Sequence, residues 1–488
     1  MKKNKSLLSF IALLSLVFIF SACSSSNGVE NPKDALSAFL NEEKDIVAFG
    51  NLNINNLLVK MDYTTIPKFG KIINGQVQDW EKIIDLKSPV YYAVQGPVSR
   101  DMDPKTTFAF FKIKDKKGVI SKLSQDGFDF NEVDNISYTE DGEFTIGLTD
   151  KVGIIIFKNG EFDAKKLISD TFKKTKGTTS GGSVDDILES KGDLVLGMNI
   201  ESLYSNSDVD FSSLSKGKQK ELKELLEDAY IQTIFKFEDG AAIIETKNIF
   251  STKLEDKLFF KADKKAPINS YLGKGIPRMG FSINLDMNKM NELINEFSPE
   301  AISELAKSIG PQAQIALMFS GKDGLAAFLD GRIGAVLFSD LKDYDGQIPN
   351  INAFIGLTKK GKDLGEDFGS ENMNYNGANF FFNEEGLMIN SDPSLANTSL
   401  NNDLKLPEGC ENFGQGALSF FVNLEGVNLD EVELEGEANV LRAVQYITFD
   451  YTNEGGVLYI KAKEGHENIL KQAMDAMLKG YFDENTRP

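Results

Sequence analysis

Short apolar runs that end in asparagine recur four times along the chain, and an isoleucine or leucine follows each asparagine. Runs of this length that are followed by turn residues are typical of buried β-strands. Asparagine suits the turn from a strand into a helix, because its side chain accepts a hydrogen bond from a free amide of the first helical turn. The predicted strand-to-helix junctions are Asn53, Asn199, Asn284 and Asn423.

The four runs form two pairs at nearly equal distances. The first and third asparagines lie 231 residues apart, and the second and fourth lie 224 residues apart. Two further segments, Ala109–Gly118 and Ala353–Gly361, also resemble one another. Near-equal offsets at three places predict an internal duplication, and chance similarity between strands is the alternative.

Other segments have the hydrophobic period of strands or helices. Further strands are expected at Val90–Gln95, Thr107–Ile113, Val152–Phe157, Ile231–Phe237, Ala242–Asn248, Ile315–Phe319, Ala378–Phe382, Gln445–Tyr451 and Val457–Ala462. Helices are expected at Asp79–Asp85, Ala164–Lys174, Lys216–Asp228, Pro299–Ile309 and Glu467–Phe482. Hairpins with interspersed helices predict an α+β protein of two similar lobes, each with mostly antiparallel sheets and packed helices.

The N-terminal segment has the organisation of a secretory leader. Three lysines precede the apolar run Leu7–Phe20, which is shorter than the roughly 20 residues of a membrane span. Small Ser21 and Ala22 then lead to Cys23. The sequence Phe20-Ser21-Ala22-Cys23 resembles a bacterial lipobox, although such motifs prefer leucine in place of Phe20. This resemblance implies lipidation at Cys23 and a membrane anchor, and the alternative is an ordinary signal peptide with a chance cysteine.

The residues after Cys23 are small and polar, which predicts a flexible tether. Asn31-Pro32 is expected to prevent any helix before the first folded element. By resemblance to lipoprotein sorting rules, Ser24 indicates the outer membrane, and no acidic cluster precedes Glu30. We therefore expect an envelope protein on the periplasmic side of the outer membrane, with surface exposure as the alternative.

These features predict five segments. They are a lipoprotein signal peptide (1–22), a flexible tether (23–44), a first α+β lobe (45–263), a second α+β lobe that repeats the first (264–463) and a C-terminal helix (464–488).

Charge and composition restrict the partners. Removing the three lysines of the leader takes the formal charge from −20 to −23. The negative electrostatic field of such a chain repels the phosphates of nucleic acid. Beyond Cys23 only Cys410 remains, so no intrachain disulfide is available. There are 36 phenylalanines against one tryptophan, which indicates a large core or, alternatively, an apolar ligand cavity.

One segment, together with the recurring asparagine junctions and the lipobox, suggests a family. Asp85-Leu86-Lys87-Ser88-Pro89-Val90-Tyr91-Tyr92 resembles Bacteroidetes lipoproteins that are grouped only as a domain of unknown function. The resemblance extends over most of the mature chain, and it implies no catalytic residue because the family has none assigned.

Motifs for catalysis and cofactor binding are incomplete. His466 is the sole histidine and is accompanied by no nucleophile motif, while Cys410 lies between two acids that disfavour its thiolate. The segment Gly356–Asp363 has the G-x-x-x-x-G-K spacing of a P-loop but ends in aspartate where Ser or Thr is required. Ser213–Lys216 has the S-x-x-K spacing without an accompanying K-T-G. We therefore predict no catalytic, cofactor-binding or metal-binding residue, and only Cys23 as a modification site.

Acidic clusters are abundant. Asp208 with Asp210 and Asp343 with Asp345 have ligand chemistry for calcium, but neither fits EF-hand spacing. The run Asp430–Glu437 is expected to be a solvated face. A single tryptophan, Trp80, gives little platform for sugars.

Three function classes stay open. The first is a non-enzymatic envelope module that binds another envelope component, in addition to the membrane. The second is a carrier of apolar ligands such as lipids, and the third is a glycan hydrolase that uses two carboxylates.

Overall fold

The structure is a computed structural model with two compact units. It describes residues 31–486, apart from 42, 44, 67–69, 99–103, 143, 159–162, 175–181, 207–213, 262–267, 299–303, 305–306, 308–319, 339–349, 369–371, 376–377, 392–402, 409, 411–412 and 428–435. Unit 1 consists of Met1–Val209, Glu227–Glu238 and Asn468–Asp475, and unit 2 of Asp210–Leu226, Asp239–Glu467 and Ala476–Pro488. The division falls at residues 238 and 239, whereas the predicted lobe boundary was at residue 264.

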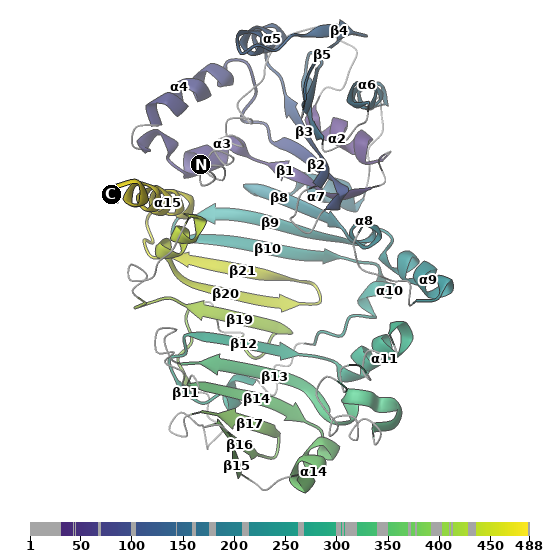
Figure 1. Cartoon of the computed structure of the whole chain (residues 1–488), viewed down its shortest axis with the longest axis vertical. Helices are drawn as coiled ribbons and strands as arrows, with labels where there is room; N and C mark the ends of the chain where they lie inside the picture. Colours follow the sequence, from purple (N-terminus) through teal and green to yellow (C-terminus); the bar gives the residue numbers. More distant parts are fainter. Residues whose placement is uncertain are drawn as a thin grey trace. The chain divides into compact units, whose positions relative to one another are not determined.

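Unit 1 is built on an antiparallel sheet in the strand order β9-β8-β1-β2-β3-β7-β6-β5-β4 (Figure 1). Its strands are β1 (Ile46–Leu52), β2 (Val90–Val98), β3 (Pro104–Lys112), β4 (Asn131–Val133), β5 (Ile136–Asp141), β6 (Phe144–Leu148), β7 (Val152–Lys158), β8 (Leu194–Asn199) and β9 (Tyr230–Glu238). Its helices are α2 (Pro32–Leu40), α3 (Ile54–Lys60), α4 (Gly70–Glu81), α5 (Lys116–Gln125), α6 (Ala164–Lys174), α7 (Ser183–Glu189) and α8 (Ile200–Ser205).

Helices of unit 1 pack on both faces of its sheet. On one face, the rings of Phe39 in α2 and Phe108 in β3 have centroids 4.4 Å apart. On the other face, Phe111 joins a buried cluster that includes Leu58 of α3 and Trp80 of α4. Consecutive side chains of a strand point to opposite faces, so β3 contributes large apolar groups to both layers.

The first described helix corrects one expectation. Asn31 caps α2 by accepting a hydrogen bond from the Asp34 amide at 2.9 Å, and Pro32 begins the helix. Proline is well placed there because the first helical turn leaves its amides unpaired in any case. The tether predicted for residues 23–44 therefore overlaps the fold of unit 1.

Unit 2 is built on antiparallel strands in the order β10-β21-β20-β19-β12-β13-β14-β17-β16-β15 (Figure 1). Its strands are β10 (Ala241–Ile249), β12 (Met279–Asn284), β13 (Leu329–Leu337), β14 (Ile351–Leu357), β15 (Asn372–Tyr375), β16 (Ala378–Phe382), β17 (Gly386–Asn390), β19 (Leu418–Asn423), β20 (Val444–Thr452) and β21 (Gly455–Ala462). The short strands β11 (Lys274–Gly275) and β18 (Asp403–Leu404) form a separate parallel pair. The helices are α9 (Lys216–Leu226), α10 (Thr252–Glu255), η2 (Ile268–Tyr271), α11 (Met287–Phe297), η3 (Gly321–Ala327), α14 (Lys359–Phe368) and η7 (Gly436–Ala443).

The α+β class with antiparallel sheets is confirmed. The predicted helix at Ala164–Lys174 has the bounds of α6, while the helix predicted at Asp79–Asp85 is wrong in position because α4 ends at Glu81. The predicted C-terminal helix is α15 (Ile469–Thr486). The predictions at Ile315–Phe319 and, for the most part, at Pro299–Ile309 lie outside the described residues.

Two of the four asparagine junctions are confirmed. Asn53 and Asn199 cap α3 and α8, each accepting from the amide three residues later. Asn284 does not cap α11, because Asp286 accepts from the Lys289 amide at 3.1 Å and takes that place. The buried Asn284 side chain donates instead to the Gly416 carbonyl at 2.6 Å.

The fourth junction is a turn. Asn423 ends β19 and its side chain accepts from the Glu425 amide at 3.0 Å, and no helix follows within the residues described there.

Candidate functional site

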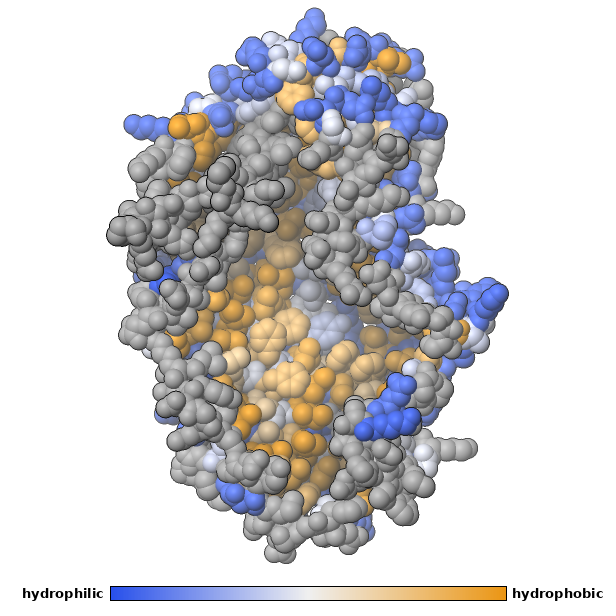
Figure 2. Space-filling view, in the orientation of Figure 1, coloured by the Kyte–Doolittle hydropathy of each residue, from blue (hydrophilic) through white to orange (hydrophobic). Residues whose placement is uncertain are grey.

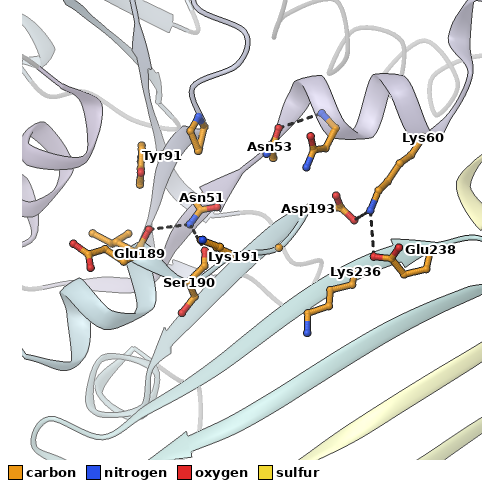
Figure 3. Close-up of a pocket in the computed structure, with 14 residues that line it drawn as sticks. Asn51, Asn53, Lys60, Tyr91, Glu189, Ser190, Lys191, Asp193, Lys236 and Glu238 are labelled. Atoms are coloured by element: carbon orange, nitrogen blue, oxygen red, sulfur yellow. Dashed lines mark hydrogen bonds and ion pairs between the residues drawn. The ribbon is translucent and has the colours of Figure 1, made fainter.

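Unit 1 contains a polar pocket of about 710 Å³ where β1, β8 and β9 meet the segment after α7 (Figure 3). Three lysines and three carboxylates line it, together with asparagines, Tyr91 and Ser190. The charged lining residues are Lys60, Lys191, Lys236, Glu189, Asp193 and Glu238. Equal numbers of opposite charges give the pocket no net charge that would select an ion.

Ion pairs and hydrogen bonds hold this lining together. Lys60 Nζ lies 2.8 Å from Asp193 Oδ2 and 3.5 Å from Glu238 Oε1. The Asp193 carboxylate also accepts from the Phe237 amide at 2.7 Å, and its side chain is 3% exposed. Asn51 donates to the Leu188 carbonyl at 3.0 Å, and burial raises the pKa of the Tyr91 phenol. These contacts fasten the end of α3 to β9 and to the residue before β8, and they fasten β1 to α7. The polar residues that make them therefore have a structural role.

Unit 2 has a sheet whose two faces differ sharply. In β12, the residues Gly280, Ser282 and Asn284 are buried, whereas Met279 and Phe281 are 37% and 42% exposed. The small and polar residues therefore point into the protein, and the large apolar residues point away from it. β12 therefore reverses the usual pattern of a sheet with one covered face.

The covered face has its own core. Phe421, Phe354, Val336 and Tyr271 are all at least 91% buried there, and η2 contributes to the same cluster. The rings of Tyr271 and Phe354 stack at 4.2 Å. Serine and asparagine side chains fill the tight spaces beside them, and Ser282 accepts from the Gly414 amide at 3.1 Å.

On the opposite face, strand register aligns the apolar side chains into three rows. The central row runs Ile244, Leu458, Phe449, Phe420, Phe281, Ala335, Ala353, Ile389 and Phe380. The two flanking rows run Ala242, Ile460, Ile447, Val422, Met279, Leu337 and Ile351, and Thr246, Gly456, Tyr451, Leu418, Ile283, Ile333, Ile355, Leu387 and Phe382. We call these three rows the apolar face.

Most members of the apolar face are half-buried, and only Ala242 is fully buried. In Figure 2, apolar side chains gather over the strands of unit 2. Apart from Tyr451 and Thr246 at one end, the rows carry no side-chain donor or acceptor. The backbone groups of these strands pair with one another in the sheet ladders. The face therefore offers hydrocarbon contact and little else.

The residues singled out from the sequence lie elsewhere. Cys23 is outside the described residues, as are both aspartate pairs, Ser213 and most of the acidic run. His466 is exposed in the turn before α15, and Cys410 is buried in the core of unit 2.

The P-loop-like segment is a helix cap. Gly356 lies inside β14, and the Thr358 hydroxyl accepts from the Gly361 amide at 3.1 Å at the start of α14. Trp80 is 4% exposed within the core of unit 1, so it offers no sugar platform. Among the described residues there is no group of three potential metal-ligating side chains, and no helix combines the length and apolar character needed to cross a bilayer.

The apolar face is the site that sequence reasoning missed. The alternation in β12 separates large apolar residues from small and polar ones, and it is visible in the sequence. The sequence predicts only that such strands are buried, and it does not predict an apolar side left uncovered, because the covered face of a sheet is normally the apolar one.

Comparison with known proteins does not assign the chain to a family. No protein-family model matches the chain, and no curated protein matches it. Crystal form III of TP0453 is similar over 47% of this chain and 84% of that chain, with 11% identity and a TM-score of 0.28. Crystal form IV of TP0453 covers 43% and 79%, with 10% identity and a TM-score of 0.27. Similarity at this level supports no conclusion about function.

Proposed function

We propose that the protein is a lipid-anchored envelope protein whose second unit binds the acyl chains of a lipid on the apolar face. The observation that carries the proposal is the apolar face of unit 2 and the reversed pattern of β12 within it, in which Ser282 is fully buried while Phe281 beside it is 42% exposed. Acyl-chain binding is the second of the three classes open from the sequence, and the apolar face favours it.

The size of the apolar face supports a binding role. Nine strands spaced by about 4.8 Å and three rows about 6.6 Å apart give a surface of roughly 38 by 13 Å, or ~500 Å². An apolar patch of that order is at the upper end of what monomeric proteins expose, and such patches commonly mark a binding site.

The chemistry of the face selects the occupant. Protein interfaces carry about one hydrogen bond per 100–200 Å², so a protein partner on this area would need several polar contacts. The three rows provide side-chain donors and acceptors only at the end formed by Thr246 and Tyr451. An acyl chain needs no polar contact along its length, and about ten buried methylenes would contribute ~8 kcal/mol before the cost of association.

The predicted anchor supports the same proposal. Lipidation at Cys23 would hold the protein at the outer membrane, on its periplasmic side, where lipids are the abundant apolar ligands. The lipobox and the resemblance to Bacteroidetes lipoproteins support this location, with surface exposure as the alternative. No cofactor, nucleic acid or catalytic activity is part of the proposal, and an envelope protein that delivers or accepts the lipid is a second expected partner.

A fluorescence titration tests the proposal. The full chain carrying Cys23→Ser is titrated with a pyrene-labelled fatty-acid methyl ester, a neutral probe. We expect saturable binding that Phe281→Gln weakens about tenfold, the factor for ~1.4 kcal/mol of lost apolar contact. The matched control is Val133→Gln in unit 1, because Val133 is also an exposed apolar residue, at 59%.

Three outcomes would contradict it. The first is no binding, and the second is equal effects of the two substitutions. The third is a concentration-dependent dimer that loses stability with Phe281→Gln, which would make the apolar face an interface between two copies.

We also propose that the two units arose by duplication. The order β9-β8-β1-β2-β3-β7-β6-β5 in unit 1 corresponds, strand by strand along the chain, to β20-β19-β12-β13-β14-β17-β16-β15 in unit 2. α5 and α14 occupy the same place, after β3 and β14. Superposing the eight strand pairs tests this proposal, and a mismatch in register across β1 and β12 would argue against it.

A further inference from the structure

The end of the apolar face at Tyr451 carries a group of polar atoms that the protein itself leaves unpaired. Asn248 in β10 continues the side of the strand on which Ala242, Ile244 and Thr246 lie, because side chains alternate along a strand. Its side-chain amide donates to the Tyr451 hydroxyl at 2.6 Å and to the Asn453 carbonyl at 2.9 Å.

The orientation of each amide is determined by its partner. A backbone carbonyl only accepts, so the Asn248 group facing the Asn453 carbonyl must be the nitrogen. Asn453 in turn donates to the Phe260 carbonyl at 2.9 Å, which fixes its amide by the same reasoning. Both Oδ1 atoms are buried without a hydrogen-bond partner, and Asn248 as a whole is 9% exposed.

The Tyr451 hydroxyl completes the group. It accepts from Asn248, so its own proton is available for donation. The Phe260 ring meets the Tyr451 ring edge-on at 5.6 Å, and Phe449 stacks on it at 6.2 Å. Aromatic packing therefore holds the phenol at this end of the apolar face, beside the Asn248 amide.

We propose that this group, Asn248, Tyr451 and Asn453, binds the head of a neutral hydroxylated lipid whose chain lies on the apolar face. The inference rests on the proposed function and names the class of ligand. Two unpaired acceptors and one donor match a head that offers two O–H donors and an acceptor, as the glycerol of a monoacylglycerol does.

The two unpaired Oδ1 atoms disfavour other lipid head groups. A carboxylate or phosphate would bring its negative charge against two carbonyl oxygens, in a chain with a formal charge of −20. A methyl ester or a quaternary ammonium has no proton to donate, so it would leave both buried acceptors unpaired. Leaving such groups unpaired is costly, and this makes the head, as well as the chain, a determinant of affinity.

Three ligands of equal chain length test the inference: a monoacylglycerol, the fatty-acid methyl ester and the free fatty acid. Isothermal titration is carried out below their aggregation concentrations with the full Cys23→Ser chain. We expect the monoacylglycerol to bind most tightly. Tyr451→Phe should weaken monoacylglycerol binding by about two- to twelvefold, the range for one hydrogen bond.

The matched control is Tyr459→Phe. Tyr459 lies opposite Thr448 in the β20–β21 ladder, on the other face of the sheet from Tyr451. Equal affinity for the three ligands, or equal effects of the two phenylalanine substitutions, would overturn the head-group inference while acyl binding stands. Absence of binding by all three would instead remove the proposed function itself.

Discussion

Two phenylalanines on neighbouring strands of unit 2 allow the exposure of the apolar face to be tested by stability alone. Phe421 in β19 is 1% exposed on the covered face, and Phe281 in β12 is 42% exposed on the apolar face. The perturbation is the same in both cases, truncation to alanine. Their strands pair with each other, so backbone context is closely matched.

The expected losses differ severalfold. The Phe421 ring meets Phe413 edge-on at 5.0 Å and lies over Gly280, where an added Cβ would come within 2.2 Å of it. Truncating such an enclosed ring should cost about 3–5 kcal/mol of unfolding free energy. Complete burial of a phenylalanine contributes about 1.5–3 kcal/mol, so Phe281, with somewhat over half of its surface covered, should lose about 1–1.5 kcal/mol.

Urea denaturation followed by circular dichroism measures both losses. With a slope of about 2–3 kcal/mol per molar urea, Phe421→Ala should lower the midpoint by ~1–2.5 M and Phe281→Ala by ~0.3–0.75 M. Trp80 is the only tryptophan and belongs to unit 1, so its emission monitors that unit separately. Equal losses for the two variants would show that the apolar face is covered in solution, and the reasoning would then be wrong.

Further predictions concern the anchor, the reactive side chains and alkaline pH. Cys23→Ser should move the mature protein from the membrane fraction to the soluble one; a variant that stays in the membrane and incorporates a fatty-acid label would contradict the lipobox interpretation. Cys410→Ser combined with His466→Gln should leave lipid binding and any cellular phenotype intact, and loss of the phenotype in a stable, anchored protein would favour an enzyme. Burial raises the pKa of Tyr138 to about 12, above its ordinary value of 10.0, so the folded protein retains a proton that the unfolded chain loses. Stability should therefore fall between about pH 10 and pH 12, less so in Tyr138→Phe, and an unchanged urea midpoint over that range would refute this.

The sequence predicted local structure well where one residue decides it. Asn53 and Asn199 cap helices as expected, because the capping bond depends only on a side chain and an amide three residues on. The sequence did not predict strand β13, because Gly331, Gly334 and Arg332 interrupt its apolar pattern. Those residues serve tertiary packing: a Cβ at Gly331 would lie 2.0 Å from the Leu285 carbonyl oxygen. Such a close approach is invisible in the sequence of one strand.

The candidate site shows a different limit. The strand Met279–Asn284 alternates cleanly, so the sequence determined which residues share a face. Which face the rest of the chain covers depends on segments far away in sequence, such as η2 and the residues around Phe413. The polar end of the face was equally hidden, because Asn248 and Asn453 meet only through the pairing of β10 with β21.

Photo-crosslinking gives the most direct test of acyl binding on the apolar face. A monoacylglycerol with a diazirine in its chain is bound to the full Cys23→Ser protein, irradiated and mapped by peptide mass spectrometry. We expect crosslinks on β12, β19 and β20, concentrated at Phe281, Phe420 and Phe449, and competed by unlabelled monoacylglycerol. Crosslinks confined to exposed apolar residues of unit 1, such as Val133, or labelling that excess lipid does not displace, would contradict the account.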